Sequence, residues 1–368
     1  MRVLMTTDPI GGVWTFSREL AAELLAHGCA VALVSLGRIP TGGQLDWVEA
    51  QVARWGARFR FAASDAPLEW MQNNQDACKD AEPMLRRIAQ EFRADLLLSS
   101  QFCFGALKGD LPRIVVAHSD VLSWAAACRN HPLPASPWLD RYRHLVAEGL
   151  RRADAVVAPT RWMLDALAAH FPLPAETRVI PNGRTLPPFR GGAARRRQAV
   201  TAGRLWDEGK NLALLDTVSS PMPILVAGET EHEGARAEHL CGSAISLGPL
   251  EEEELLALFR QSSLYICTSQ YEPFGLAPLE AALCGCAVLT NDISSLREVW
   301  RNDALFFHDA QSLSALLAEL NNDENLLAHA RARSHARALQ LTATRMAGGY
   351  LDLMQGILQP VLVEHYVA

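Results

Sequence analysis

The chain has 368 residues, of which 49% are hydrophobic and 20% are charged, and its formal net charge is −7. This balance is typical of a folded globular protein and excludes a disordered chain or a fibrous repeat. The length predicts two domains, and the acidic net charge excludes a general nucleic-acid binder, which needs a basic surface to neutralise phosphates.

The first half of the chain alternates short apolar runs with helical patterns. Strands are predicted at RVLMTT, AVALVSLG, ADLLLSS, RIVVAH, AVVAPT and TRVIPNG, and a helix is predicted over TFSRELAAELLAHG. Alternation of this kind predicts a parallel sheet with helices on both faces. Such sheets bind ligands at the carboxyl ends of their strands, so we expect the chemistry in the loops that follow strands.

The same rhythm restarts after residues 184–198, which are rich in proline, glycine and arginine and are predicted to link two domains. The later strands are predicted at QAVTAG, PILVAGE, SAISLG, LYICTSQ, CAVLTN and ALFFHD. We expect a first domain of residues 1–185 joined by residues 345–368, and a second domain of residues 186–344. The predicted fold class is α/β, with two Rossmann-like, doubly wound parallel-sheet domains that face a central cleft.

Two features of the first domain lie directly after predicted strands. Gly11 and Gly12, in DPIGG, would let the backbone approach a ligand closely, although the full G-x-G-x-x-G fingerprint is absent. A plain tight turn is the alternative. His118 ends the strand RIVVA, so its ring is expected to face the cleft, with a purely structural histidine as the alternative.

The segment GRLWDEGK follows the first strand of the second domain. Arg204 and Lys210 in this segment are two cations beside a glycine, as a clamp on a diphosphate requires. The alternative is a pair of surface charges. Lys210 would then lie near the start of a helix, where a positive charge is mildly unfavourable.

The segment EPFGLAPLE places Glu272 and Glu280 on either side of a predicted helix start. Eight helical residues correspond to about 12 Å of rise and about 80° of rotation, so both carboxylates could border one elongated ligand. The N–H groups of Phe274, Gly275 and Leu276 lie between them and favour an anion. A ligand with hydroxyls at both ends and an anion between them fits this order. A capped amphipathic helix with an exposed Glu280 is the alternative.

The spacing of the cysteines and of other possible metal ligands argues against a metal site. The eight cysteines are scattered, mostly among apolar neighbours, which predicts reduced and buried thiols. Cys284 and Cys286 form a C-x-C without a second ligand pair, so core packing is preferred to zinc. No Asp-x-Asp, P-loop or G-x-S-x-G motif is found, and we expect neither a metal site nor a hydrolase or kinase.

The start of the chain and its apolar segments bear on location. Met1 leads directly into a strand-like run without the features of an export signal, and no segment has the length of a membrane span. We expect a cytoplasmic protein. Peripheral contact with the inner face of the membrane stays open.

Taken in order, these motifs resemble those of the family-4 retaining glycosyltransferases of the GT-B fold. The matching stretches are the Gly-Gly turn, His118, ADAVVAPT, VIPNG, GRL with a downstream lysine, and the E-x7-E helix, which together cover nearly the whole chain. The resemblance implies metal-independent transfer of a sugar, with retention, from a UDP- or GDP-type nucleotide sugar to a hydroxyl acceptor. It implies no prosthetic group.

The resemblance also implies roles for the donor-side residues. Glu280 would hold the ribose, and Glu272 would bind hydroxyls of the donor sugar. Arg204 and Lys210 would grip the diphosphate, assisted by the N–H groups of residues 274–276. Stabilisation of the leaving group would then dominate catalysis.

Other positions carry weaker implications or depart from the family pattern. Gly12 would approach the phosphates or the acceptor, His118 would line the reacting centre, and Gly248 lies in the region that surrounds the base. After GRL the family commonly has Glu-Lys-Gly, whereas residues 208–210 read Glu-Gly-Lys, which leaves the reach of Lys210 open.

The acceptor is expected to bind to first-domain loops, chiefly residues 62–84 and 119–138. These carry Trp70, Trp124 and Trp138, whose rings suit either a sugar face or loop packing. A saccharide, a lipid-linked saccharide and a small molecule all stay open as acceptors. Two other functions also stay open: a nucleotide-sugar epimerase and a non-catalytic nucleotide-sugar-binding protein.

Overall fold

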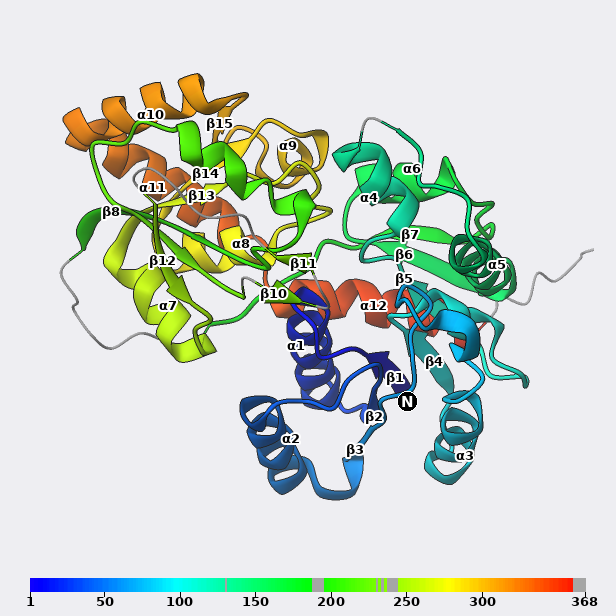
Figure 1. The fold of residues 1–368 in the computed structure, drawn as a ribbon. Coiled ribbons are helices and arrows are strands. Elements are labelled where there is room, and N and C mark those ends of the chain that lie inside the picture. The colour runs from blue at the N-terminus through cyan, green and yellow to red at the C-terminus, as the bar shows by residue number, and fades with distance from the viewer. Residues whose placement is uncertain (130, 187–194, 230, 233–234, 237–243, 360–368) are drawn as a thin grey trace, which may run out of the picture.

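Two parallel sheets, each covered by helices, form two lobes (Figure 1). The structure is a computed structural model that describes residues 1–129, 131–186, 195–229, 231–232, 235–236 and 244–359. The two-domain α/β prediction is confirmed at the level of these two sheets.

The first lobe is built on a seven-stranded sheet in the order β3-β2-β1-β4-β5-β6-β7, with every pairing parallel. Its central strands are apolar runs with no exposed residue, as expected for a sheet buried on both faces. The strands are β1 (Arg2–Thr7), β2 (Ala30–Ser35), β3 (Phe59–Ala63), β4 (Leu96–Ser99), β5 (Arg113–Val116), β6 (Ala155–Ala158) and β7 (Thr177–Val179). The helices are α1 (Gly12–Ala26), α2 (Gly42–Trp55), α3 (Glu82–Phe92), α4 (Val121–Cys128), α5 (Pro137–Arg152) and α6 (Arg161–Ala168).

The second lobe contains a six-stranded sheet in the order β12-β9-β8-β13-β14-β15, again parallel, and a small antiparallel pair of β10 and β11. The strands are β8 (Arg196–Ala202), β9 (Ile224–Ala227), β10 (Glu231–His232), β11 (Ala235–Arg236), β12 (Ala244–Gly248), β13 (Ser262–Cys267), β14 (Ala287–Asn291) and β15 (Leu305–Phe307). The helices are α7 (Glu252–Gln261), α8 (Leu276–Leu283), α9 (Ser294–Trp300), α10 (Ala310–Asn322) and α11 (Glu324–Ala338). The last helix, α12 (Ala343–Leu358), follows this lobe in the chain.

The chain crosses between the lobes twice. The first crossing follows β7, and the second connects α11 to α12, which returns to the first lobe and packs beside α1 (Figure 1). Tyr350 of α12 is fully buried there, and its ring lies 5.8 Å from that of Phe16. The predicted linker, residues 184–198, includes the start of β8 at Arg196. Two predicted parts lie outside the described residues: residues 187–194 of the linker and residues 360–368 of the first domain.

One close approach of backbones fixes α5 in the first lobe. This helix packs on the short 3-10 helix η3 (Phe102–Ala106) with no room for a side chain at Gly149. A Cβ atom there would lie 1.8 Å from the carbonyl oxygen of Phe102, and a Cβ atom on Gly105 would lie 2.2 Å from that of Gly149. Two glycines facing each other therefore allow this contact.

The prediction of reduced thiols is wrong for two cysteines. Cys78 and Cys103 form a disulfide bond, with their Cα atoms 6.2 Å apart. The bond joins the segment before α3 to η3, and this proximity arises from packing that the sequence spacing does not reveal. Among the described residues, the free cysteines are Cys29, Cys267, Cys284 and Cys286, which are buried, and Cys128, which is half-buried.

The first-lobe segment expected to be acceptor loops is more regular than predicted. Residues 119–138 contain all of α4 and the start of α5, so Trp124 and Trp138 lie on helices. The Trp138 indole N–H donates to the carbonyl oxygen of Met71 over 2.7 Å, and its ring stacks on Tyr142 at 6.0 Å. The contacts of Trp138 are therefore explained by packing within the first lobe, the alternative to binding a sugar face.

Within the part of the chain that the structure describes, none of the helices combines the length and the apolar character needed to cross a bilayer.

Candidate functional site

Lys210 and Glu272 form an ion pair where the ends of β8 and β13 meet. Lys210 closes the short 3-10 helix η4 (Glu208–Lys210), Glu272 follows β13, and the lysine Nζ lies 2.5 Å from the Oε2 of the glutamate. The hydroxyl of Thr268 donates to the Lys210 carbonyl and ties η4 to the β13 loop. Burial opposes the lysine charge, but the Glu272 carboxylate outweighs it, so the pKa of Lys210 is raised and the group stays cationic.

Arg204 is the more exposed of the two predicted diphosphate ligands, with 43% of its side chain accessible. Its guanidinium donates to the Oδ2 of Asp207 over 2.7 Å. The Oδ1 of Asp207 accepts from the N–H of Gly209 and from the Trp124 indole of the first lobe. Asp207 therefore orients Arg204 and also joins the two lobes beside it.

The N-terminus of α8 faces the glycine turn of the first lobe. A Cβ atom on Gly12 would lie 3.3 Å from the Cδ1 atom of Leu276, so these two segments are in contact. Gly275 precedes α8 with φ +89°, and a Cβ atom there would lie 2.8 Å from the Cγ of Pro278, so this position requires glycine. No side chain caps the start of α8 within the described ranges, which leaves first-turn N–H groups available for an anion.

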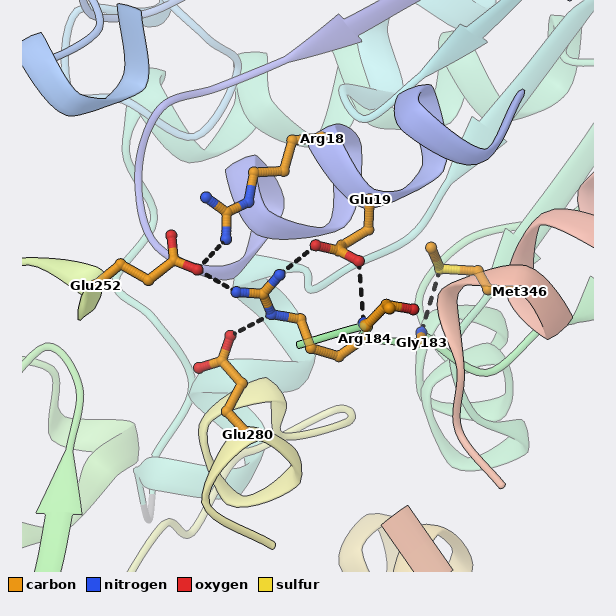
Figure 2. Close-up of polar contacts among 8 residues, drawn as sticks. Arg18, Glu19, Gly183, Arg184, Glu252, Glu280 and Met346 are labelled. Atoms are coloured by element: carbon orange, nitrogen blue, oxygen red, sulfur yellow. Dashed lines mark hydrogen bonds and ion pairs between the residues drawn. The ribbon is translucent and has the colours of Figure 1, made fainter. Parts of the chain in front are cut away.

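Glu280 is paired with an arginine that the sequence analysis did not single out. The Nε atom of Arg184 donates to the Oε1 of Glu280 (Figure 2), over a distance of 2.8 Å. Only 12% of the glutamate side chain is exposed. Burial raises the pKa of Glu280, and Arg184 opposes that rise. The alternative of an exposed, solvated Glu280 is therefore wrong.

His118 lies on the first-lobe side, after β5. Its Nε2 atom is 3.2 Å from the hydroxyl of Ser100, and its ring meets Phe16 edge to face at 4.5 Å. Burial lowers the pKa of His118 to about 3, so the ring is neutral at physiological pH. A neutral ring can share a hydrogen bond with a ligand hydroxyl but is a weak base.

Asp8 is a further charged residue at this edge of the first sheet. It directly follows β1, is 5% exposed and accepts a hydrogen bond from the N–H of Ile10. Burial raises its pKa to about 6, against the attraction of Arg204 and Arg38. Its position at the carboxyl end of a strand was the available signal. Arg184 gave none, because it lies in a segment interpreted as a linker.

The two remaining predicted positions are turn residues. Gly11 precedes α1 with φ +63°, as a tight turn needs. Gly248 ends β12, and its carbonyl accepts the N–H of Gly228 over 2.8 Å. The described contacts do not join Gly248 to the other predicted site residues.

The described site holds the lobes together and leaves little free volume. A cavity of about 10 Å³ lies beside Lys210 and Glu272, room for roughly one water molecule. Across the lobes, the hydroxyls of Tyr271 and Ser123 are 2.9 Å apart, and Arg129 binds Glu208 at 3.0 Å. We expect these contacts to separate when a ligand as large as a nucleotide sugar binds.

Comparison with protein families gives matches in both lobes. A model described as Glycosyltransferase Family 4 matches residues 10–186, and a model described as Glycosyl transferases group 1 matches residues 210–337. The chain belongs to the family-4 glycosyltransferases. The resemblance inferred from the motifs is confirmed.

Solved structures place this glycosyltransferase in the GT-B fold. Sucrose-phosphate synthase from Thermosynechococcus elongatus has a TM-score of 0.75 at 16% identity and is matched over 97% of this chain and 99% of that one. HepE from Anabaena, solved in complex with UDP-glucose, has a TM-score of 0.70 at 17% identity, over 97% and 100%. At these identities the similarity shows the fold, and the predicted fold class is confirmed.

Relatives in sequence include enzymes named glycogen synthase and mannosyltransferase. Glycogen synthase from Mycobacterium tuberculosis is 29% identical over 286 residues, which cover 70% of this chain and 68% of the relative. The serotype-specific mannosyltransferase WbdA from Escherichia coli is 38% identical over 118 residues, which cover 30% of this chain and 14% of the relative. The chain is thus a hexosyltransferase-type glycosyltransferase that uses a nucleotide-sugar donor.

The neutral state of His118 in this glycosyltransferase predicts a pH dependence of stability. Because its pKa falls from 6.5 to about 3 on folding, the unfolded chain takes up a proton near pH 6.5 that the folded chain does not. This contribution to the free energy of unfolding is present above pH 6.5 and is lost as the pH falls toward 3. His118→Gln should therefore show a shallower loss of stability than the parent between about pH 7 and 5.

Urea denaturation at several pH values measures this difference. His329→Gln, on the exposed side of α11, is the matched control and should follow the parent. Equal slopes for the parent and His118→Gln would contradict the prediction.

Proposed function

We propose that this enzyme transfers a sugar from a UDP- or GDP-sugar to a saccharide hydroxyl, with retention of anomeric configuration and without a metal ion. The observation that carries the proposal is the Lys210–Glu272 pair, which lies at 2.5 Å between the carboxyl ends of β8 and β13. A cation and a hydroxyl acceptor side by side fit the boundary between the leaving phosphate and the donor sugar.

The donor is proposed to lie along the start of α8. Glu280 would accept the ribose hydroxyls, and Lys210 with Arg204 would neutralise the diphosphate together with the helix N–H groups. Glu272 would bind sugar hydroxyls through Oε1, since its Oε2 is held by Lys210. In this order the carboxylates would lie beside hydroxyls of the donor, and the cations and N–H groups would lie beside its phosphates.

Two cations at the diphosphate would supply the charge stabilisation that a divalent metal provides in other transferases. Lys210 remains protonated beside Glu272, so this charge is present at neutral pH. That arrangement supports a reaction that does not depend on a metal ion.

Retention is proposed to proceed by attack on the face from which the phosphate departs. The leaving phosphate oxygen would then take the acceptor proton, and no dedicated base is needed. The low pKa of His118 supports this, because such an imidazole accepts a proton poorly at pH 7. His118 would instead hydrogen-bond a hydroxyl of the reacting sugar.

The acceptor is proposed to be a saccharide, bound on the first lobe near His118. The names of the relatives, glycogen synthase and mannosyltransferase, support a saccharide acceptor. A lipid-linked saccharide would bring a cytoplasmic enzyme to the inner face of the membrane.

A thermal-shift panel of UDP-, GDP- and ADP-sugars tests donor binding, since a ligand of the folded state raises Tm with its saturation. The donor that binds is then incubated with and without saccharide acceptors. Product analysis by NMR reports the anomeric configuration, and a chelator tests the metal dependence. Retained configuration with a chelator present supports the proposal; interconversion of the donor sugar without acceptor would favour an epimerase instead.

Arg204→Ala and Glu272→Gln should both reduce turnover at a saturating acceptor concentration. Arg87→Ala is the matched control, because Arg87 forms an exposed ion pair with Glu91 within α3 of the first lobe, whereas both site variants lie in the second lobe. Unchanged turnover in both site variants would refute the site assignment.

A further inference from the structure

Arg184 binds three carboxylates from three helices at once. Its Nε donates to Glu280 of α8, one terminal nitrogen donates to Glu19 of α1, and the other donates to Glu252 of α7 (Figure 2). The arginine side chain is 3% exposed. Although burial opposes its charge, the three carboxylates raise the pKa of Arg184, so it stays cationic.

The three partners belong to both lobes. Glu19 lies in the first lobe, whereas Glu252 and Glu280 lie in the second, and Arg18 of α1 also binds Glu252. Arg184 therefore connects the proposed ribose carboxylate to α1 through a single guanidinium. With two arginines and three glutamates, the cluster contains one more negative than positive charge.

The backbone at Arg184 is fixed where the two chain crossings meet. Its N–H donates to the carbonyl oxygen of Leu341, and the N–H of Thr185 donates to Glu19. The preceding residue, Gly183, packs so closely that a Cβ atom would lie 2.0 Å from the carbonyl oxygen of Thr342. The side chain of Arg184 thus starts from a rigid point beside both crossings.

Only one oxygen of Glu280 is used by this contact. Arg184 holds Oε1, and among the described residues no hydrogen bond or ion pair reaches Oε2. A planar guanidinium bound through Nε sets the direction of the carboxylate and leaves the second oxygen to accept hydroxyls.

We propose that Arg184 is a positioning residue for the donor: it orients the Glu280 carboxylate toward the ribose and ties that orientation to α1 of the opposite lobe. The inference rests on the proposed role of Glu280 in holding the ribose. Without Arg184, three carboxylates would face one another with only Arg18 beside them, and Glu280 would turn away or take up a proton.

The experiment compares two ligands on each protein variant. The first is whichever of UDP, GDP and ADP binds most tightly, and the second is its 2′,3′-dideoxy analogue, both titrated by calorimetry. The base and diphosphate are shared, so the ratio of the two Kd values reports the ribose hydroxyls alone. Because both ligands meet the same folded protein, a loss of stability does not change the ratio. For the parent we expect a ratio of about 10 to 100, as for hydrogen bonds to a charged group.

Arg184→Met should reduce this ratio to below about threefold, and Arg184→Lys should give an intermediate value, since one ammonium cannot replace a planar donor to three carboxylates. Arg337→Met is the matched control. Arg337 of α11 is also a buried arginine, 8% exposed. Its Nε atom donates to the carbonyl oxygen of Val299, and it does not contact Glu280. Its ratio should equal that of the parent.

Glu280→Ala separates this inference from the proposed function. If Glu280→Ala and Arg184→Met both lose ribose discrimination, the inference is supported. A loss in Glu280→Ala with a full ratio in Arg184→Met would overturn it and leave the ribose role of Glu280 intact. Full discrimination in Glu280→Ala would refute that role and the inference with it. If Arg184→Met does not fold, Arg184→Lys decides, and a parental ratio in that variant overturns the proposal.

Discussion

Replacement of Lys210 by methionine is expected to lower kcat for glycosyl transfer by about 100- to 1000-fold, the usual effect of removing one donor from a site of developing negative charge. The lysine ammonium is the cation that touches Glu272 and is held by η4 at the end of β8. Methionine fills similar space without the charge, so the loss should fall on the departure of the diphosphate. Single-turnover kinetics with saturating donor measure the chemical step directly.

The double variant Lys210→Met with Glu272→Gln separates catalysis from stability. Breaking a buried ion pair by removing one partner typically costs about 3–5 kcal/mol, and this pair, about one-fifth exposed, should lie below that range. Neutralising both partners should recover part of the lost stability, as measured by urea denaturation. Activity should stay low in the double variant. Recovery of turnover together with stability would show that the pair is structural only.

The second large effect is expected at Gly149, where Ala should destabilise the first lobe by about 1–3 kcal/mol, as overpacking in a core does. The added Cβ atom would lie 1.8 Å from the carbonyl oxygen of Phe102, so α5 must move away from η3. The neighbouring contacts of Trp138 and Tyr142 on α5 would shift with it. Thermal unfolding of the parent and the variant measures the difference.

Gly348→Ala is the matched control for this substitution. Gly348 also lies within a helix, α12, but a Cβ atom there would meet nothing within 4 Å. Alanine is preferred to glycine in a helix interior by about 0.5–1 kcal/mol, so Gly348→Ala should stabilise the protein slightly. Equal effects at both positions would contradict the steric explanation for Gly149.

Strand prediction succeeded where apolar runs are continuous. The buried strands β1, β4, β6 and β13 read as such runs, because both faces of a parallel sheet are covered. The edge strand β3 was not predicted, since Arg60 interrupts its apolar residues and one side of it is open. The helix α4 was missed within a segment rich in turn residues.

For the candidate site, the rule that ligands lie after strands identified the segments but not the partners of each side chain. Arg204, Lys210 and Glu272 were found this way, and the structure adds the direct contact of the last two. Asp8 obeys the same rule and was passed over in favour of the glycines beside it. Arg184 could not be found, because its three partners are 68 to 165 residues away in the chain. The Cys78–Cys103 bond joins residues only 25 apart, but it depends on packing that the spacing of the cysteines does not reveal.

The meeting of the two crossings limits how the molecule can open to admit a substrate. Gly183 lies against Thr342, and Arg184 is bonded to Leu341, so the halves share a fixed pivot at this point. Moving the two lobes straight apart would break this junction, whereas rotating one lobe about it would leave the junction intact. Contacts that bridge the halves elsewhere, such as that of Trp124 with Asp207, are the ones expected to part. We therefore expect the nucleotide sugar to enter by a rotation of the lobes with one end anchored.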